Sequence, residues 1–396
     1  MTISDLNIKG RRALVRVDFN VPLDKSRNVQ DDTRIRRALP TIKALLKGGA
    51  SVVLMSHLGR PKGVSEEFSL KHIVSHLEDL LGNPVQFASD CVGDSALDVS
   101  QNLKPGEIAL LENLRFHEEE KGGDEFFAGQ LAENGDLYIN DAFGTAHRNH
   151  ASTAVIARFF PEDKAFGKLL EAEISALSKV MTEPARPLLA IIGGAKVSSK
   201  LTVLENMVEK VDKLMIGGGM AYTFILAKGG KVGASLVEKE MVERAKAVLE
   251  RAANSSTEIL LPEDSVCADQ FSADANFVVC NSDEIKEGWM GLDIGPKACE
   301  KFAAAVKESK TVLWNGPMGV FEFEACSKGT FTVANALKYA TEKGAYTLVG
   351  GGDSVAAINA CGLADDVSYV STGGGAMLEY LEGKTLPGIA AILDWY

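Results

Sequence analysis

The 396-residue sequence predicts an α/β protein with two doubly wound, Rossmann-like parallel-sheet domains joined by a bridging helix and a hinge. Three observations lead to this fold class. The chain is longer than the roughly 100 to 200 residues that one core usually organises. Short β-branched runs alternate with helical patterns from end to end, which is typical of a parallel sheet flanked by helices. One amphipathic segment separates the runs into two sets.

The predicted strands of the first half are ALVRV (13–17), SVVLMS (51–56), PVQFA (84–88), IALLE (108–112) and DLYIN (136–140). Those of the second half are PLLAII (187–192), KLMI (213–216), EILLP (258–262), TVLW (311–314), AYTLV (345–349) and SYVS (368–371). Between the sets, apolar residues repeat at helical spacing from Leu170 to Met181, and Pro184 ends the pattern. This segment, 167–184, is the predicted bridging helix.

Composition excludes several classes of protein. The net charge of −12 argues against binding to the phosphate backbone of nucleic acid. No uncharged apolar run reaches the ~18 residues of a membrane span, and the start MTISDLNIKGRR lacks a secretory signal, so we expect a cytoplasmic protein that does not bind membranes. The six cysteines form no C-x-x-C pair or metal-ligand spacing, so we expect small buried residues or free thiols, and no disulfides.

Cationic residues are distributed unevenly. All six histidines and 11 of the 14 arginines precede residue 160. Arginine suits the planar gripping of carboxylate and phosphate, so the first half is expected to hold a small anion, although surface arginines also cluster by chance. The acidic run 117–125 is expected to be a solvated loop or a helix start.

Glycines follow the strands of the second half almost every time. The loops are IIGGAK (191–196), MIGGGMA (215–221), LWNGPMG (313–319), LVGGGDS (348–354) and VSTGGGA (370–376). Ligands of open parallel sheets bind outside the carboxyl ends of the strands, and glycine lets backbone N–H groups face an anion. Although strand-to-helix turns favour glycine anyway, five such loops predict a phosphate or nucleotide site. No loop reads G-x-x-x-x-G-K-[ST] or G-x-G-x-x-G, which disfavours a P-loop NTPase and a standard dinucleotide fold.

Three charged residues stand next to these loops. Lys196 and Lys200 lie where a helix over 199–210 should begin, and a lysine there is unfavourable unless an anion sits between them; the alternative is two solvated lysines. Asp353 follows Gly350–Gly352 and opens another helix. It is either a helix N-cap or a ligand of Mg²⁺ on a bound polyphosphate, and its spacing does not decide between these roles.

Polar residues replace glycine after the strands of the first half. The segments are RVDFN (16–20), SHLGRP (56–61), ENLRFH (112–117) and NDAFGTAHRNH (140–150), with TRIRR (33–37) adding cations. A zinc site at His147 and His150 would need a third ligand and an H-E-x-x-H context, and neither is visible. Arg148 between them fits one wall of an anion pocket better, with the histidines held by local hydrogen bonds. An anion on one half and a phosphate-bearing molecule on the other predict phosphoryl transfer.

These segments together resemble phosphoglycerate kinase, from RVDFNVPLD near the start to LEGKTLPGI near the end. The resemblance also rests on SHLGRPKG, LLENLRFHEEE, NDAFGTAHRNHAS, GGAKVSSK, IGGGMAYTF, GLDIGP, LWNGPMGVFE, VGGGDS and STGGGA. It implies a monomeric glycolytic kinase that moves a phosphoryl group reversibly between 1,3-bisphosphoglycerate and ADP, giving 3-phosphoglycerate and ATP. The transfer would be in line, with Mg²⁺ and no general base.

The resemblance implies a domain plan. Residues 1–166 with about 378–396 would bind 3-phosphoglycerate, 167–184 would form the interdomain helix, and 185–377 would bind nucleotide. Hinge closure is expected, with pivots near the bridging helix and Gly373–Gly375. Met377 and Tyr380 depart from the family pattern, and the departure concerns packing around the last glycine triplet.

The resemblance also implies the site residues. Catalytic positions are Arg34, Lys196, Lys200, Gly352 and Gly375. The acid substrate would contact Asp18, Phe19, Asn20, Arg34, His57, Leu58, Gly59, Arg60, Arg115 and Arg148. Nucleotide would contact Lys200, Gly217, Gly218, Gly219, Asn315, Glu322, Gly351, Gly352, Asp353 and Ser354, and Asp353 would hold the metal.

Two other classes of function remain as alternatives. A nicotinamide-dependent oxidoreductase would use the same architecture, but its glycine fingerprint is missing. A non-catalytic binder would keep the fold, but Arg34, Lys200 and Asp353 are all present.

Overall fold

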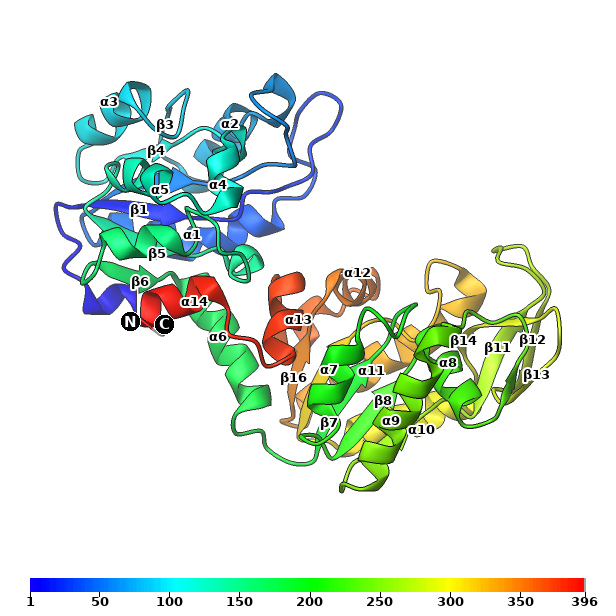
Figure 1. The fold of residues 1–396 in the computed structure, drawn as a ribbon. Helices are drawn as coiled ribbons and strands as arrows, with labels where there is room; N and C mark the ends of the chain where they lie inside the picture. The colour runs from blue at the N-terminus through cyan, green and yellow to red at the C-terminus, as the bar shows by residue number, and fades with distance from the viewer. Residues whose placement is uncertain (395–396) are drawn as a thin grey trace. The chain divides into compact units, whose positions relative to one another are not determined.

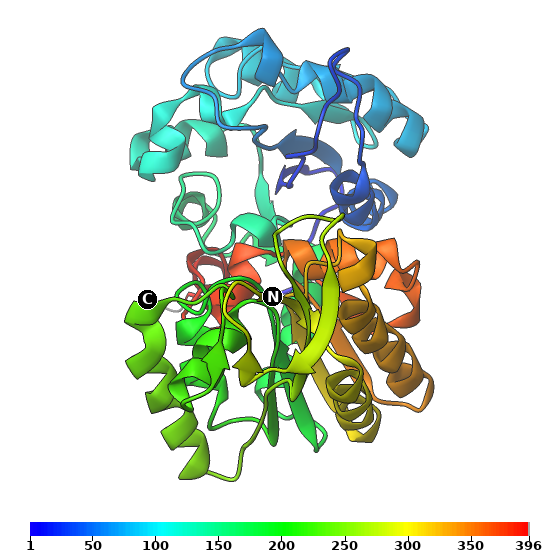
Figure 2. The same ribbon diagram turned by 90° about the vertical axis from the view of Figure 1, so that its right-hand side faces the viewer.

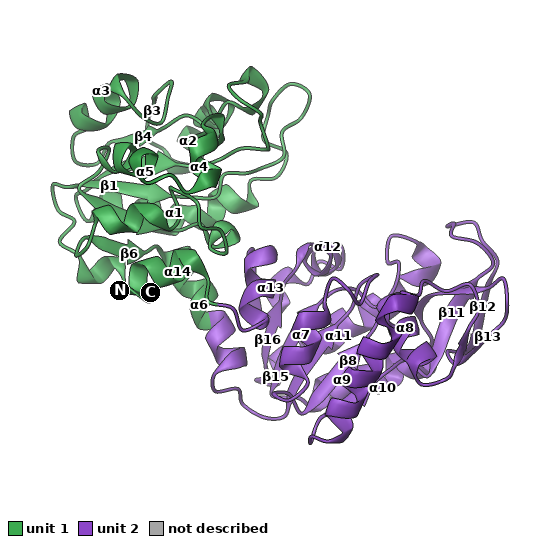
Figure 3. Ribbon diagram, in the orientation of Figure 1, with its two compact units in different colours: residues 1–175, 385–396 green, residues 176–384 purple. Residues whose placement is uncertain are grey.

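The computed structural model describes residues 1–394 and divides into two compact units (Figures 1 and 3). Unit 1 contains residues 1–175 and the segment from Thr385 onward, and unit 2 contains residues 176–384. The boundary falls inside helix α6 (Lys168–Met181). The chain re-enters unit 1 later than the expected position near 378, because α13 (Gly375–Leu381) packs against α7 (Leu201–Met207) of unit 2. Residues 395–396 of the expected C-terminal segment lie outside the described chain.

Unit 1 is built on a six-stranded parallel sheet in the order β3-β4-β2-β1-β5-β6. Its strands are β1 (Arg12–Arg16), β2 (Ser51–Met55), β3 (Val85–Phe87), β4 (Ile108–Leu110), β5 (Leu137–Asn140) and β6 (Lys164–Phe166). Its helices besides α6 are α1 (Thr33–Lys47), α2 (Lys71–Leu81), α3 (Asp94–Asn102), α4 (Glu118–Gly122), α5 (Glu125–Ala132) and α14 (Pro387–Leu393). The central strands are apolar and fully buried, as expected for a sheet covered on both faces.

Unit 2 repeats this plan with a parallel sheet in the order β10-β8-β7-β15-β16-β17. Its strands are β7 (Leu188–Ile192), β8 (Lys213–Ile216), β10 (Glu258–Leu260), β15 (Thr311–Asn315), β16 (Tyr346–Val349) and β17 (Tyr369–Val370). Its other helices are α8 (Met220–Ala227), α9 (Val242–Ala253), α10 (Pro296–Glu308), α11 (Lys328–Glu342) and α12 (Gly352–Ala360). Figure 2 shows the green helices α8 and α9 on one face of this sheet and the yellow and orange helices α10 and α11 on the other.

All the strands predicted from the sequence are present, with ends within two residues of the predicted ones. The prediction missed β6 and a small antiparallel sheet of β11 (Asp264–Ala268), β12 (Phe277–Asn281) and β14 (Met290–Ile294). It also missed the pair β9 (Lys231–Val232) and β13 (Glu284–Ile285). These strands are short, and several are partly exposed, so they lack a long apolar run.

Each parallel sheet has one point where the strand order reverses. In unit 1 it lies between β1 and β5, and in unit 2 between β7 and β15. Ligands of doubly wound sheets bind in the crevice at such a point, beyond the carboxyl ends of the strands. The polar segments of unit 1 and the glycine loops of unit 2 start at these ends. No helix within residues 1–394 is long and apolar enough to cross a membrane.

Candidate active site

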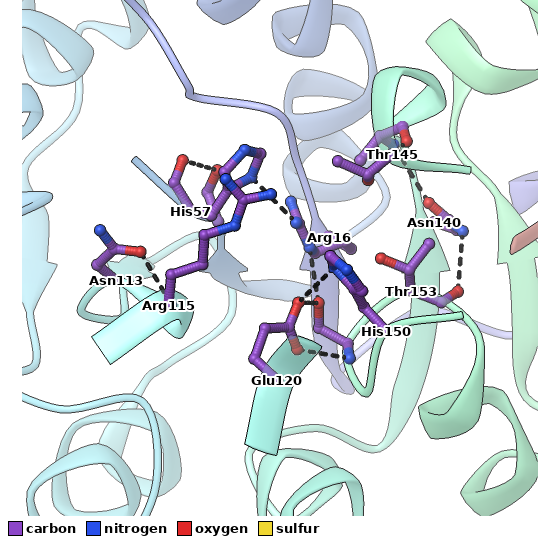
Figure 4. Close-up of polar contacts among 12 residues, drawn as sticks. Arg16, His57, Asn113, Arg115, Glu120, Asn140, Thr145, His150 and Thr153 are labelled. Atoms are coloured by element: carbon purple, nitrogen blue, oxygen red, sulfur yellow. Dashed lines mark hydrogen bonds and ion pairs between the residues drawn. The ribbon is translucent and has the colours of Figure 1, made fainter. Parts of the chain in front are cut away.

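A buried arginine organises the carboxyl end of the unit 1 sheet (Figure 4). Arg16, the last residue of β1, has no exposed surface. Its Nε donates a 2.8 Å hydrogen bond to Ser152 Oγ, and Ser152 in turn donates to Glu120 through Oγ (2.6 Å) and its backbone N–H (3.0 Å). The serine therefore links the buried cation to a buried carboxylate.

The acidic run 117–125 contains a helix start, as expected, because helix α4 begins at Glu118, but Glu120 is not solvated. The neighbouring residues Glu118 and Glu119 are exposed, but Glu120 has no exposed surface. Helix α4 turns one carboxylate of the run inward, where hydrogen bonds from Ser152 stabilise its charge.

His57 is kept neutral by its surroundings. It is 3% exposed, and burial lowers its pKa well below the ordinary value, with further lowering by the charges of Arg16, Arg115 and Arg34. An Arg16 NH2 group lies 3.2 Å from His57 Nδ1, and because a guanidinium can only donate, Nδ1 accepts. The proton of the neutral ring is then on Nε2, so His57 is a hydrogen-bond donor at that atom.

A chain of hydrogen bonds connects the predicted acid-binding residues. Arg34 NH1 donates to Asp18 Oδ2 (3.0 Å) and to the backbone oxygen of Asn20 (3.1 Å). Asn20 Oδ1 accepts from the N–H of Gly59 (2.8 Å), whose backbone oxygen accepts from Arg115 NH1 (2.7 Å). The structure thus brings these five residues together from three loops and helix α1.

Arg115 also has a donor without a partner. Its Nε is buried and makes no hydrogen bond within residues 1–394, and burial lowers the pKa of this guanidinium. An orphaned cationic donor is costly unless an anion occupies it. Arg60 is exposed, and its positive charge contributes to lowering the pKa of Arg115.

The segment 147–150 was predicted to supply one wall of an anion pocket through Arg148. Arg148 is exposed, and its charge contributes to lowering the pKa of His150 to about 4, behind the larger effect of burial. His150 Nδ1 lies 3.7 Å from Glu120 Oε1. Neither His147 nor His150 belongs to a group of three possible metal ligands in the described chain. The geometry therefore gives the zinc alternative no third ligand.

Two predicted contacts, Phe19 and Leu58, are core residues. Phe19 has no exposed surface and Leu58 is 3% exposed, so neither side chain faces solvent. The Phe19 N–H donates to Ser56 Oγ (2.9 Å), and the Leu58 N–H donates to Asn113 Oδ1 (3.2 Å). These residues position the loops that carry their polar neighbours.

Glycine loops of unit 2 enclose a cavity of about 250 Å³. It is lined by Gly193, Gly194, Ala195, Lys196, Ser199, Lys200, Asn315, Gly316, Gly351, Gly352, Asp353 and Ser354. The turns after β7 and β15 approach so closely that a Cβ on Gly193 would lie 2.1 Å from the backbone oxygen of Pro317, and one on Gly316 would lie 2.2 Å from that of Gly193. Only glycine permits this approach of the two turns.

The cavity is positively charged at one side. Lys200 Nζ donates to Asn315 Oδ1, and Asn315 Nδ2 donates to the backbone oxygen of Gly350 (2.7 Å). Burial lowers the pKa of Lys200, and the charge of Asp353 opposes that shift. Lys196 also lines the cavity but is exposed. The cavity combines an ammonium group with the N-terminus of helix α12, and this combination suits phosphate.

A second, mainly apolar cavity of about 520 Å³ adjoins the first, sharing Gly194, Ala195 and Asp353. Its other lining residues are Gly218, Gly219, Ala234, Leu236, Phe271, Met290, Gly291, Leu292, Pro317, Gly319, Val320, Phe321 and Glu322. Its size and apolar walls fit a planar heteroaromatic group, with phosphates reaching into the glycine cavity.

Two residues of unit 2 that were predicted to belong to the site lie outside both cavities. Gly217 is buried, and a Cβ there would be 2.4 Å from Met318 Sδ, so it packs against that side chain. Gly375 begins helix α13 and lines neither cavity. Met377 of the same helix is buried, and its sulfur packs against Gly350. At this position the departure from the family pattern is therefore accommodated by close packing.

Comparison with known proteins gives a consistent result. The family model for phosphoglycerate kinase matches residues 3–384. The chain is 50% identical to the phosphoglycerate kinase of Porphyromonas gingivalis over 99% of this chain and 100% of that one. It is 54% identical to that of Gloeothece citriformis, over 98% and 97% of the two chains.

The chain belongs to the phosphoglycerate kinase family. The structure of the phosphoglycerate kinase from Coxiella burnetii superimposes with a TM-score of 0.91 at 40% identity, covering 100% of this chain and 99% of that one. Family membership makes the chain a glycolytic kinase with two parallel-sheet α/β domains. It does not support the oxidoreductase alternative.

Sequence reasoning assigned no role to three residues of the polar cluster in unit 1: Arg16, Glu120 and Ser152. A signal for Arg16 was available, because an arginine inside the apolar run ALVRV of a fully buried strand requires a buried partner. Nothing in the run HEEEK distinguishes Glu120 from its exposed neighbours, so its role was visible only in the structure.

Proposed function

We propose that the chain transfers a phosphoryl group reversibly between 1,3-bisphosphoglycerate and ADP, with the acid bound in unit 1 and the nucleotide in unit 2. The observation that carries the proposal is the pairing of two unlike sites. One is a cluster of cations around a neutral histidine, and the other is a glycine-lined cavity joined to an apolar one. We infer from the glycolytic family a monomer that works in the cytoplasm.

In the direction that consumes ATP, the nucleophile is the carboxylate of 3-phosphoglycerate. Its pKa lies far below 7, so it is ionised without help and no general base is needed. We assign the recognition of this anion to Arg34, Arg60, Arg115 and Arg148, with His57 donating from Nε2. Asp18 and Asn20 hold Arg34 in place through the hydrogen bonds described above.

The nucleotide phosphates are assigned to the glycine cavity and its lysines. Asp353 fits a Mg²⁺ ligand: it lines both cavities, it is exposed on the first turn of α12, and no hydrogen bond or ion pair within residues 1–394 engages its carboxylate. When bound, Mg²⁺ would neutralise phosphate charge. Lys200 is held by Asn315 and would stabilise charge on the transferring group, while Ser354, Gly351 and Gly352 present the start of α12 to the phosphates.

In-line transfer requires both substrates to meet. We propose that the units close during turnover, with pivots near α6 and Gly373–Gly375. Arg34 would then approach the transferring group from the acid side and Lys200 from the nucleotide side.

Steady-state kinetics with 3-phosphoglycerate and ATP test the assignment. Arg34→Ala and Lys200→Ala should each lower kcat about 100-fold or more with little change in KM, because each removes a charge needed in the transition state. Arg36→Ala, two residues along the same helix and paired with Asp32, and Lys210→Ala, an exposed lysine, are matched controls that should stay near the parent rate. A near-normal kcat in Arg34→Ala or Lys200→Ala would show that the assignment of these charges is wrong.

A further inference from the structure

Two cysteines of unit 2 lie in direct contact, although the sequence spacing gave no sign of a pair. Cys267 is in β11 and Cys280 is in β12, and their Sγ atoms are 2.9 Å apart. A disulfide bond has a sulfur separation of about 2.05 Å, so the two atoms need to approach by only about 0.9 Å to bond. Within residues 1–394 no other pair of the six cysteines makes such a contact.

The backbone of the small antiparallel sheet creates this contact. The register pairs Cys267 with Val278 and Ser265 with Cys280, so the two thiols are diagonal neighbours on one face. The same diagonal brings Ser265 Oγ to 2.7 Å from Ser282 Oγ. Strand twist shortens one diagonal of an antiparallel pair, and the irregularity between Val266 and Cys267 on the β14 side increases local twist. The proximity is therefore a property of the sheet.

The two thiols differ in access. Cys267 has no exposed surface and packs in an apolar cluster with Tyr222 and Ile225, and burial raises the pKa of its thiol. Cys280 is only partly buried. A reagent from solvent therefore reaches Cys280 first, and Cys267 is placed to react with whatever forms there.

We propose that Cys267 and Cys280 are a disulfide-forming modification site, oxidised reversibly by exchange with a small-molecule disulfide. The thiolate of Cys280 attacks the small disulfide, forms a mixed disulfide and releases one small thiol. Cys267 then loses its proton and attacks the Cys280 sulfur, which forms the protein disulfide and releases the second small thiol. The protein dithiol loses two electrons and two protons, and the small disulfide is reduced to two thiols.

The test uses the full-length enzyme and oxidised glutathione as the probe. After incubation, free thiols are alkylated under denaturing conditions and the intact mass is measured. We expect four alkylated cysteines in place of six, a loss of two hydrogen atoms and no bound glutathione, and we expect dithiothreitol to restore all six. Peptide mapping should place the new bond between residues 267 and 280.

Matched variants separate this site from general oxidation. Cys361→Ser, at a partly buried cysteine elsewhere in unit 2, should still form the bond, whereas Cys280→Ser should not. Cys267→Ser should stop at a glutathione adduct on Cys280, and Cys267→Ala repeats that measurement if the buried serine prevents folding. Kinase activity of each reduced variant confirms folding, while the thiol count does not depend on which reaction the enzyme catalyses. Six alkylated thiols, or a stable adduct, in the unmodified sequence would overturn the proposal.

Discussion

Replacement of Glu120 by glutamine tests whether its carboxylate compensates the buried charge of Arg16. Glu120 accepts two hydrogen bonds from Ser152, which itself accepts one from Arg16. Glutamine keeps one acceptor oxygen, places an amide donor against a serine donor and removes the negative charge. Hydrogen bonds to charged groups contribute about 1.5–3 kcal/mol each, so weakening both of these costs up to about 3–6 kcal/mol. We therefore expect Glu120→Gln to destabilise unit 1 by about 3–5 kcal/mol.

Hydrogen–deuterium exchange of the β1 and β5 amides is the appropriate assay. Of the three tryptophans, Trp289 and Trp314 lie in unit 2 and Trp395 lies outside the described residues, so fluorescence would not report on unit 1 alone. A loss of about 4 kcal/mol should speed the exchange of amides that open with unit 1 by roughly a thousandfold. Glu119→Gln, at the exposed neighbour in helix α4, is the matched control and should change stability by less than about 0.5 kcal/mol. A change below about 1 kcal/mol in Glu120→Gln would refute the reasoning, since Arg16 would then not depend on this carboxylate.

Three further predictions follow from single features. Gly316→Ala should destabilise unit 2 and raise KM for ATP, because its Cβ would meet the Gly193 backbone, whereas Gly344→Ala, also at positive φ but with open space around it, should cost only the strain of its backbone conformation; thermal unfolding and kinetics compare the two. Asp353→Asn should raise the Mg²⁺ concentration needed for half-maximal rate, measured by Mg²⁺ titration, and an unchanged requirement would contradict the assignment. The Asp90 hydrogen bond raises the pKa of His117, so the stabilisation by the protonated ring is complete below the unfolded value of about 6.5 and is lost as pH rises through the folded pKa. Urea unfolding should show His117→Gln more destabilised relative to the parent at pH 6 than at pH 9.

The sequence predicted the fold because parallel sheets obey strict rules. Buried strands are continuous apolar runs, and ligands bind where those runs end, so the loops after Arg16 and after Ile192 could be located from the sequence. The prediction failed where contacts between distant parts of the chain determine whether a residue is buried. Glu120 looks like its exposed neighbours, and only the position of Ser152, far along the chain, explains why it is buried.

The prediction missed the short strands for a related reason. The sheet of β11, β12 and β14 has no long apolar run, and its strands are held by pairing with one another. As a result the walls of the apolar cavity from Met290 to Leu292, and the contact between Cys267 and Cys280, had no counterpart in the sequence pattern.

The route of the chain sets an order for its synthesis. Asn140 Nδ2 donates to the backbone oxygen of Gly388, and α14 packs beside β6, so unit 1 uses contacts from both ends of the chain (Figure 1). About 210 residues separate Ser175 from Thr385. At about 5–20 residues per second, the ribosome takes roughly 10 to 40 s to make them. During that interval the nascent first unit lacks its last helix, while the contiguous second unit can fold as soon as it emerges.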